Sequence, residues 1–268
     1  MKKLLGFIAA VALSFGLLAS PALAQTGAAV SDGDGHPNVG ALLGQGPDGG
    51  LFIVCSGTLV APRVFLTASH CTSFLESIGQ TRAYVTFDPN YGTNADPSIK
   101  TTPYVGDVIT NPAYKRPYQN DASLVLLDEA VAGIVPAVIA PVGFLDALRD
   151  ARTIRSTAFT NVGYGSAEQL VVPTVGPTFP SDGIRKWTIS GFHALDKRAI
   201  HLNQNLARGY SGTGYGDSGG PTFVDTGSGP VVISVVSTGD VPCYATAVNQ
   251  RVDLADVQAF LAPYLERE

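Results

Sequence analysis

Residues 211–221 read SGTGYGDSGGP, in which a serine follows an aspartate and stands among glycines. Such a run favours a sharply turning backbone, because glycine tolerates positive φ and lets other groups approach the main chain closely. A nucleophilic serine needs this setting, with a reachable oxygen and main-chain N–H groups facing the oxyanion that forms on attack. A surface turn would have a similar composition. The stretch therefore predicts either a catalytic serine, Ser218, or an ordinary turn.

Two earlier segments favour the catalytic interpretation. Residues 65–71 read FLTASHC and contain His70, and residues 120–127 read NDASLVLL, with Asp121 before an apolar run. A histidine can accept a proton from a serine hydroxyl and return it to a leaving group near neutral pH. The chain order His70, Asp121, Ser218 is that of one known Ser-His-Asp arrangement.

The order of these residues also separates the hydrolase folds. An α/β-hydrolase carries its acid and histidine after the serine, whereas the last histidine here is His201. A subtilisin-type order requires an acid before His70. The available acids all lie in glycine-rich, turn-like sequence: Asp32, Asp34 and Asp48.

With GDSGGP at 216–221, these segments resemble the motifs of the trypsin/chymotrypsin-like serine peptidases. The family patterns are TAAHC, DIALL and GDSGGP. The first departs from the pattern at Ser69 and the second at Ala122 and Ser123, whereas the third is intact. The resemblance extends from about His36, in a loop similar to that of bacterial members, to the C-terminus.

This resemblance implies an all-β fold of two six-stranded antiparallel barrels packed face to face, followed by a C-terminal helix. The implied peptidase domain covers 36–268, with a first barrel at about 36–140, a second at about 141–252 and the helix at 253–266. The active site would lie in the cleft between the barrels. Short β-branched runs between turn residues independently predict strands at 51–54, 105–109, 124–127 and 231–236.

The prolines and glycine at positions 136, 141 and 143 indicate the break between the barrels, within 128–155. The sequence predicts one helix, at the C-terminal end. Its apolar residues recur at helical spacing, and Asp253 stands where a helix cap is expected. These apolar residues are Leu254, Val257, Leu261 and Leu265.

The resemblance also implies the roles of the site residues. Ser218 would be the nucleophile, His70 the general base, and Asp121 the group that orients the imidazole. Asp107 and Asp128 are nearby acids, but Asp121 directly precedes the apolar run and matches the motif. The N–H groups of Gly216 and Ser218 match the oxyanion hole.

Substrate recognition is implied at six further positions of the second barrel. Ser237 matches a serine that supports the aspartate, and the main chain of 237–239, including Thr238 and Gly239, would pair with an extended substrate. The alternative is a plain strand end. Gly212, Thr213, Gly239 and Ala247 match residues around the pocket for the residue before the cut bond. Because Gly212 carries no charge where the trypsin branch has an aspartate, we predict a preference for an uncharged residue.

The chain has three cysteines. The resemblance implies a disulfide between Cys55 and Cys71, which would hold the strand predicted to carry His70 and contribute roughly 3 kcal/mol by loop closure. Two buried free thiols are the alternative, and export disfavours them. Cys243 has no evident disulfide partner, because Gly214 occupies the position where the family has the partner cysteine. The sequence leaves open whether Cys243 is a buried apolar residue or an exposed thiol.

The N-terminal 24 residues have a charged start, an apolar stretch and a small-residue cleavage site, which predict a secretory signal peptide rather than a membrane anchor. Residues 25–35 form a short segment that is a candidate for processing. The family N-terminus IVGG, whose ammonium pairs with the acid at Asp217, is poorly matched by AVSDG at 29–33. The partner of Asp217 and the existence of a zymogen are therefore open.

Composition excludes other classes of protein. The net charge is −5 with 15% charged residues, so no basic surface for nucleic acid is expected, and no membrane contact is expected after signal cleavage. His193 and His201 lack neighbouring ligands, and no metal or cofactor is expected. We predict a secreted, monomeric serine endopeptidase acting on protein or peptide substrates. The alternatives are a catalytically silent homologue that binds a protein partner and a secreted esterase with the same triad.

Overall fold

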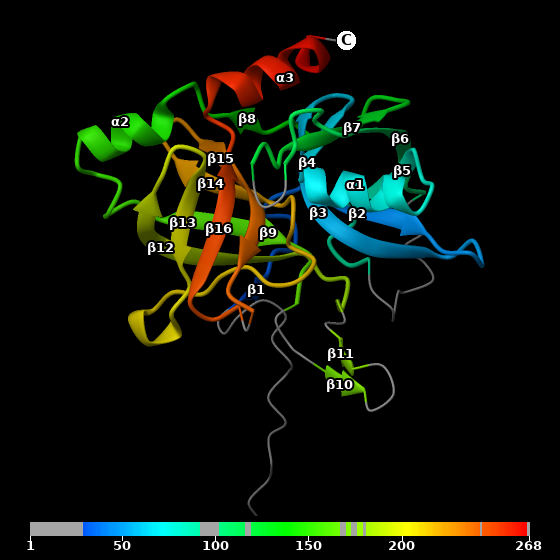
Figure 1. The fold of residues 1–268 in the computed structure, drawn as a ribbon, viewed down its shortest axis with the longest axis horizontal. Helices are drawn as coiled ribbons and strands as arrows, with labels where there is room; N and C mark the ends of the chain where they lie inside the picture. Colours follow the sequence, from blue (N-terminus) through cyan, green and yellow to red (C-terminus); the bar gives the residue numbers. More distant parts are fainter. Residues whose placement is uncertain are drawn as a thin grey trace, which may run out of the picture.

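Two closed six-stranded antiparallel barrels lie side by side in the computed structural model of the chain, as Figure 1 shows. The structure describes residues 29–91, 102–115, 119–166, 170–172, 176–178, 181–241 and 243–266. The predicted signal peptide, 1–24, lies outside these residues. The two-barrel architecture implied by the resemblance is confirmed.

The first barrel has the strand order β2-β3-β4-β7-β6-β5. Its interior is filled by a cluster of buried apolar side chains that includes Leu42, Leu59 and Phe65. The predicted strands at 51–54, 105–109 and 124–127 lie within β3, β6 and β7. The six strands are β2 (Val39–Gln45), β3 (Leu51–Ala61), β4 (Val64–Thr67), β5 (Arg82–Thr86), β6 (Tyr104–Ile109) and β7 (Ser123–Leu127).

The second barrel closes through the pairing of β9 with β12. The predicted strand at 231–236 lies within β15. The six strands of the second barrel are β9 (Phe159–Gly163), β12 (Lys186–Leu195), β13 (Ala199–Asn203), β14 (Pro221–Asp225), β15 (Pro230–Gly239) and β16 (Thr246–Arg251). Two short strands add to the second sheet: β1 (Val30–Ser31) pairs with β12, and β8 (Val138–Ile139) pairs in parallel with β15. A separate two-stranded sheet is formed by β10 (Leu170–Val172) and β11 (Gly176–Thr178).

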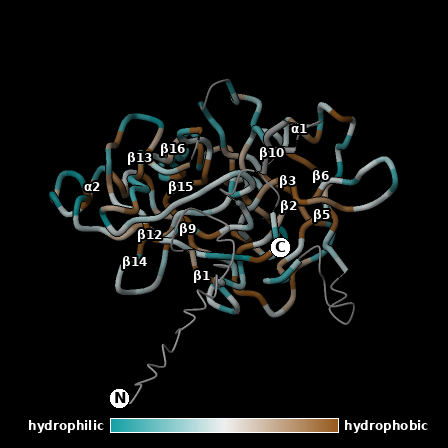
Figure 2. The backbone as a smooth tube through the Cα atoms, turned by 90° about the horizontal axis from the view of Figure 1, so that it is seen from below, coloured by the Kyte–Doolittle hydropathy of each residue, from teal (hydrophilic) through white to brown (hydrophobic). Residues whose placement is uncertain are grey.

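A shared apolar core joins the barrels. Val39 and Leu66 of the first barrel, Val235 of the second and Leu261 of the C-terminal helix belong to one buried cluster. Figure 2 shows the hydrophobic segments concentrated in the barrel strands, with hydrophilic loops around them. Because both barrels bury side chains against each other, their relative position is fixed by packing rather than by the connecting segment alone.

The structure contains three helices among the described residues, not one: α1 (Ser69–Ser77), α2 (Phe144–Asp150) and α3 (Ala255–Leu265). The sequence analysis predicted that His70 lies on a strand, but His70 lies in the first turn of α1. α1 was missed because it is short and follows directly on β4. None of the helices described is long and apolar enough to span a bilayer.

The predicted cap of the C-terminal helix was also wrong. Leu254 occupies the N-cap position, with no side-chain cap hydrogen bond. The carboxylate of Asp253 is instead buried, where it pairs with Arg251 and accepts a hydrogen bond from the Leu145 amide at the start of α2. Both partners form charge-assisted hydrogen bonds with the carboxylate, which is therefore directed to Arg251 and α2 rather than to α3.

The disulfide between Cys55 and Cys71 is present and closes a loop with a sequence separation of 16. It joins β3 to α1, so it fixes the helix that carries His70. Cys243 is free and buried, with 8% of its surface exposed. Of the two states that the sequence left open for Cys243, the structure therefore shows the buried one.

Candidate active site

His70 and Asp121 form a closely bonded pair. The main-chain N–H of His70 donates to Oδ1 of Asp121 at 2.8 Å, and Nδ1 of the His70 ring lies 2.8 Å from Oδ2. Two contacts to one carboxylate fix both the backbone and the ring of the histidine. Asp121 is 1% exposed, whereas the His70 side chain is 32% exposed, so the outer edge of the ring is open to solvent.

The second barrel holds this carboxylate from the other side. The hydroxyl of Ser237, on β15, donates to Oδ2 of Asp121, and Oε1 of Gln250, on β16, accepts from the Asp121 amide at 3.0 Å. Burial raises the pKa of Asp121, but the hydrogen bonds from His70 and Ser237 outweigh it, and the net pKa is lowered. The carboxylate is therefore ionised where it faces the imidazole.

The loop that carries Ser218 is pressed against the segment that precedes His70. Gly219 has φ of +79°, and a Cβ there would lie 2.2 Å from Oγ1 of Thr67 and 2.7 Å from the Ala68 amide nitrogen. Only glycine fits this approach. It brings the chain beside Ser218 against residues that stand directly before His70.

Ser56 of β3 ties the same loop to the first barrel. Its amide donates to the carbonyl of Ser218 at 2.8 Å, and its hydroxyl donates to the carbonyl of Gly216 at 2.8 Å. The carbonyls of Gly216 and Ser218 are thus bonded to Ser56. The N–H groups of the same two residues have no hydrogen-bond partner within the described residues. Among the residues that the structure describes, no hydrogen bond joins Oγ of Ser218 to the ring of His70. Catalytic contacts of this kind often tighten only when substrate binds.

Asp217, whose partner the sequence left open, is fully buried. Its Oδ1 accepts from the amide of Gly165 at 2.8 Å, and its Oδ2 accepts from the amide of Gly214 at 2.7 Å. A Cβ at Gly165 would lie 2.5 Å from Cγ of Asp217. Main-chain amides thus bind both carboxylate oxygens next to Ser218. Ser56 and Gly165 were not predicted, because their sequence neighbourhoods carry no sign of these contacts.

Comparison with known protein families matches residues 26–257 to the trypsin family. This is nearly the whole chain. The chain belongs to the trypsin family. No relative was found among curated proteins.

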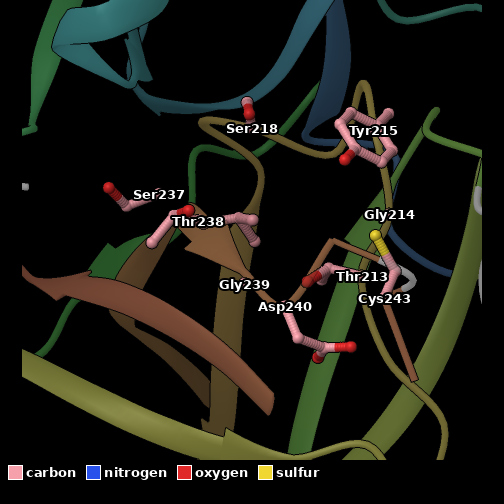
Figure 3. A pocket seen from close by; sticks show the side chains of 10 residues that line it. Thr213, Gly214, Tyr215, Ser218, Ser237, Thr238, Gly239, Asp240 and Cys243 are labelled. Carbon is pink, nitrogen blue, oxygen red and sulfur yellow. The ribbon is translucent and has the colours of Figure 1, made fainter. Parts of the chain in front are cut away.

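A cavity of about 130 Å³ opens beside Ser218 in this trypsin-family chain (Figure 3). Figure 3 shows Ser218 at one end, with Thr213, Asp240 and Cys243 toward the other. The residues around it are Thr213, Gly214, Tyr215, Ser218, Val236, Ser237, Thr238, Gly239, Asp240 and Cys243. Thr213, Ser237, Thr238 and Gly239 are among those predicted from the sequence.

Two predicted members of the pocket do not line it. Ala247 is 1% exposed and packs in the core of the second barrel. Gly212 is covered by Gln204, whose Oε1 would lie 1.9 Å from a Cβ at that position. The side chain of Gln204 thus fills the space beside Gly212, and the next residue, Thr213, lines the cavity instead.

Asp240 is a pocket residue that the sequence analysis missed. Its carboxylate accepts amide N–H bonds from Tyr244, Ala245 and Thr246 at 2.7 to 3.0 Å. Burial raises the pKa of Asp240, but these hydrogen bonds outweigh it, and the net pKa is lowered. The only signal in the sequence that Asp240 lines the pocket was its position directly after Gly239.

Proposed function

We propose that this chain is a secreted serine endopeptidase in which Ser218, His70 and Asp121 act as a catalytic triad. Membership of the trypsin family supports a serine peptidase in general. The observation that supports the specific assignment is the His70–Asp121 pair, because the carboxylate fixes the imidazole while the loop of Ser218 lies against the segment that precedes His70.

The proposed reaction follows from this arrangement. His70 accepts the hydroxyl proton while Oγ of Ser218 bonds to the carbonyl carbon of the substrate. The carbonyl oxygen becomes an oxyanion that the Gly216 and Ser218 amides stabilise. The C–N bond then breaks, and His70 gives its proton to the leaving amine. Water, deprotonated by the same histidine, cleaves the acyl-enzyme and restores Ser218.

Substrate would bind along the end of β15. Thr238 and Gly239 line the cavity there, and an extended peptide can pair with their main chain. We propose an uncharged residue before the cut bond. Gly212 supplies no charge, and the Asp240 carboxylate is already bonded to three amides while it disfavours an acidic side chain.

Secretion is proposed from the sequence of residues 1–24 and from the disulfide, which is typical of exported proteins. We further propose that the mature protein works as a monomer on protein or peptide substrates, with no nucleic acid or membrane involved.

The deciding experiment treats purified mature protein with a serine-directed phosphonylating reagent and assays matched peptide and ester substrates. Labelling should occur at Ser218 alone, and Ser218→Ala should lose both labelling and peptide hydrolysis by several powers of ten. Ser228→Ala, at an exposed serine in another turn, is the matched control and should keep full activity.

Each alternative has its own outcome. Absence of labelling and of turnover would identify a silent homologue, and hydrolysis of esters alone would identify an esterase. Cleavage of a mixed peptide library would test the pocket. Dominant cutting after Arg or Lys would show that Asp240, rather than the neutral floor, decides specificity.

A further inference from the structure

The side chain of Gln204 is bonded to two stretches of chain that line the pocket beside Ser218, one at Thr213 and one at Cys243. It follows β13 and is 1% exposed. Its Oε1 accepts from the amide of Thr213 at 2.6 Å and from the Thr213 hydroxyl at 3.1 Å, and its Nε2 donates to the carbonyl of Cys243 at 3.3 Å. One buried amide group thus joins the wall at 213 to the wall at 243.

The orientation of this amide is fixed by its partners. The Thr213 N–H requires an acceptor and the Cys243 carbonyl requires a donor, and the carboxamide of Gln204 supplies one of each. The Gln204 main-chain N–H also donates to the carbonyl of Ala245 at 2.9 Å. Gln204 is therefore held to the 243–245 wall by two hydrogen bonds and to Thr213 by two more.

These hydrogen bonds of Gln204 lie near Gly214 and Cys243, the two positions that a disulfide joins in the family. Gly214 and Cys243 both line the cavity, and because Gly214 has no sulfur, no disulfide can join them. At the rim, the hydroxyl of Tyr215 donates to the carbonyl of Val241 at 3.2 Å. The walls are thus connected by side-chain hydrogen bonds, one at the rim and one set at the floor.

Gln204 also decides how deep the cavity is. The space beside Gly212 is occupied by its amide, since a Cβ there would lie 2.2 Å from Cδ of Gln204. Thr213 lies with Asp240 and Cys243 toward the end of the cavity away from Ser218, and its hydroxyl and backbone are both bonded to Gln204. A side chain entering from Ser218 therefore meets a fixed threonine.

We propose that Gln204 is a positioning residue that sets the depth of the pocket through Thr213 and restricts the residue before the cut bond to small, uncharged side chains. The proposal rests on the proposed peptidase function. Gln204 does not line the cavity, so it acts on specificity through the residues that it holds.

The test compares Gln204→Ala, Gln204→Met and wild type on peptides that differ only in having Ala, Leu or Phe before the cut bond. Gln204→Ala frees Thr213 and removes the amide beside Gly212, so the kcat/KM ratio of Phe to Ala substrates should rise about tenfold or more, as expected for a deepened apolar pocket. Gln204→Met keeps the volume without the hydrogen bonds. It should return the ratio toward the wild-type value while kcat/KM falls for every substrate.

Two controls separate this effect from loss of stability. Gln258→Ala removes two amide-to-carbonyl hydrogen bonds, to Ala140 and Val252 on the far side of the second barrel, and should leave the ratio unchanged. Thr213→Ala removes the side chain at the end of the cavity and should raise the Phe-to-Ala ratio as Gln204→Ala does. This variant keeps the proposal testable if the Gln204 variants do not fold.

Titration with the serine-directed reagent gives the active concentration of each variant. A wild type that is not labelled would refute the peptidase function itself. Labelled variants whose Phe-to-Ala ratio stays within about twofold of wild type, for both Gln204→Ala and Thr213→Ala, would overturn the role of Gln204 alone.

Discussion

Ser123 donates a hydrogen bond to Ser69, with 2.6 Å between the two hydroxyl oxygens. Both serines are fully buried, and both stand where the motifs of this chain depart from the trypsin-family pattern. The Ser69 hydroxyl in turn donates to the carbonyl of Asn120 at 2.9 Å. The two departures therefore form one contact, and Ser69 extends it to the residue before Asp121.

This pairing predicts coupling between the two substitutions that restore the family alanines. Ser69→Ala and Ser123→Ala should each lower the free energy of unfolding by about 1–2 kcal/mol, because each leaves a buried polar group without its partner. The double variant should lose less than the sum, with a coupling of about 1 kcal/mol. Urea unfolding of the four proteins measures this. Additive losses would show that the two hydroxyls act independently.

Gly165→Ala should strongly reduce peptidase activity without unfolding the protein. Its Cβ would collide with Asp217, so the carboxylate and the adjoining Gly216–Ser218 amides must shift. Loss of one oxyanion donor typically costs about 10²–10³ in kcat, and we expect a fall of that order. Steady-state kinetics and thermal unfolding should be measured together. Wild-type kcat in a folded variant would mean that Asp217 does not position the loop.

Asp32→Ala should destabilise the fold by about 3–5 kcal/mol, because it leaves the buried guanidinium of Arg185 without its carboxylate. The two side chains are each 1% exposed, and Nε of Arg185 lies 2.8 Å from Oδ2 of Asp32. Asp107→Ala, at an exposed carboxylate paired with Arg82, is the control and should change stability little. Equal losses in denaturant unfolding would contradict this assignment.

The same carboxylate predicts a dependence of stability on pH. Burial raises the pKa of Asp32, but hydrogen bonds from His36 and Arg185 outweigh it, and the net pKa is lowered. A lowered pKa means that this stabilisation is complete above the unfolded value of about 3.9 and is lost as pH falls through the folded value. The free energy of unfolding should therefore fall less steeply below about pH 4 in Asp32→Ala than in wild type. Parallel curves would exclude Asp32 as a source of acid sensitivity.

Thiol titration should find one reactive cysteine in the unfolded, unreduced protein, and none in Cys243→Ser. Burial, with the negative charges of Asp240 and Asp217, raises the pKa of Cys243 to about 11. At pH 8 the thiolate fraction is then on the order of one in a thousand, so the native protein should react slowly. Three thiols on unfolding would disprove the Cys55–Cys71 bridge. Rapid native labelling would disprove the burial of Cys243.

The sequence by itself determined those features whose signal is local. The apolar β-branched runs predicted strands that lie within β3, β6, β7 and β15, because burial of one strand face imposes a pattern on neighbouring residues. The motifs around His70, Asp121 and Ser218 identified the candidate triad, and the resemblance paired Cys55 with Cys71 correctly. Where a local signal met a partner distant in sequence, as at Asp253 with the Leu145 amide, the prediction failed.

Only the tertiary structure decided which polar groups meet across the chain. Gly165 binds Asp217 over a sequence separation of 52, and Ser56 binds Gly216 over one of 160. Gln204 accepts a hydrogen bond from the pocket residue Thr213, although nothing near Gln204 in sequence marks it for this contact. A hydrogen bond is directional and short, so its partner is set by how two loops come together in space. That placement depends on the packing of both barrels, which no local pattern of residues records.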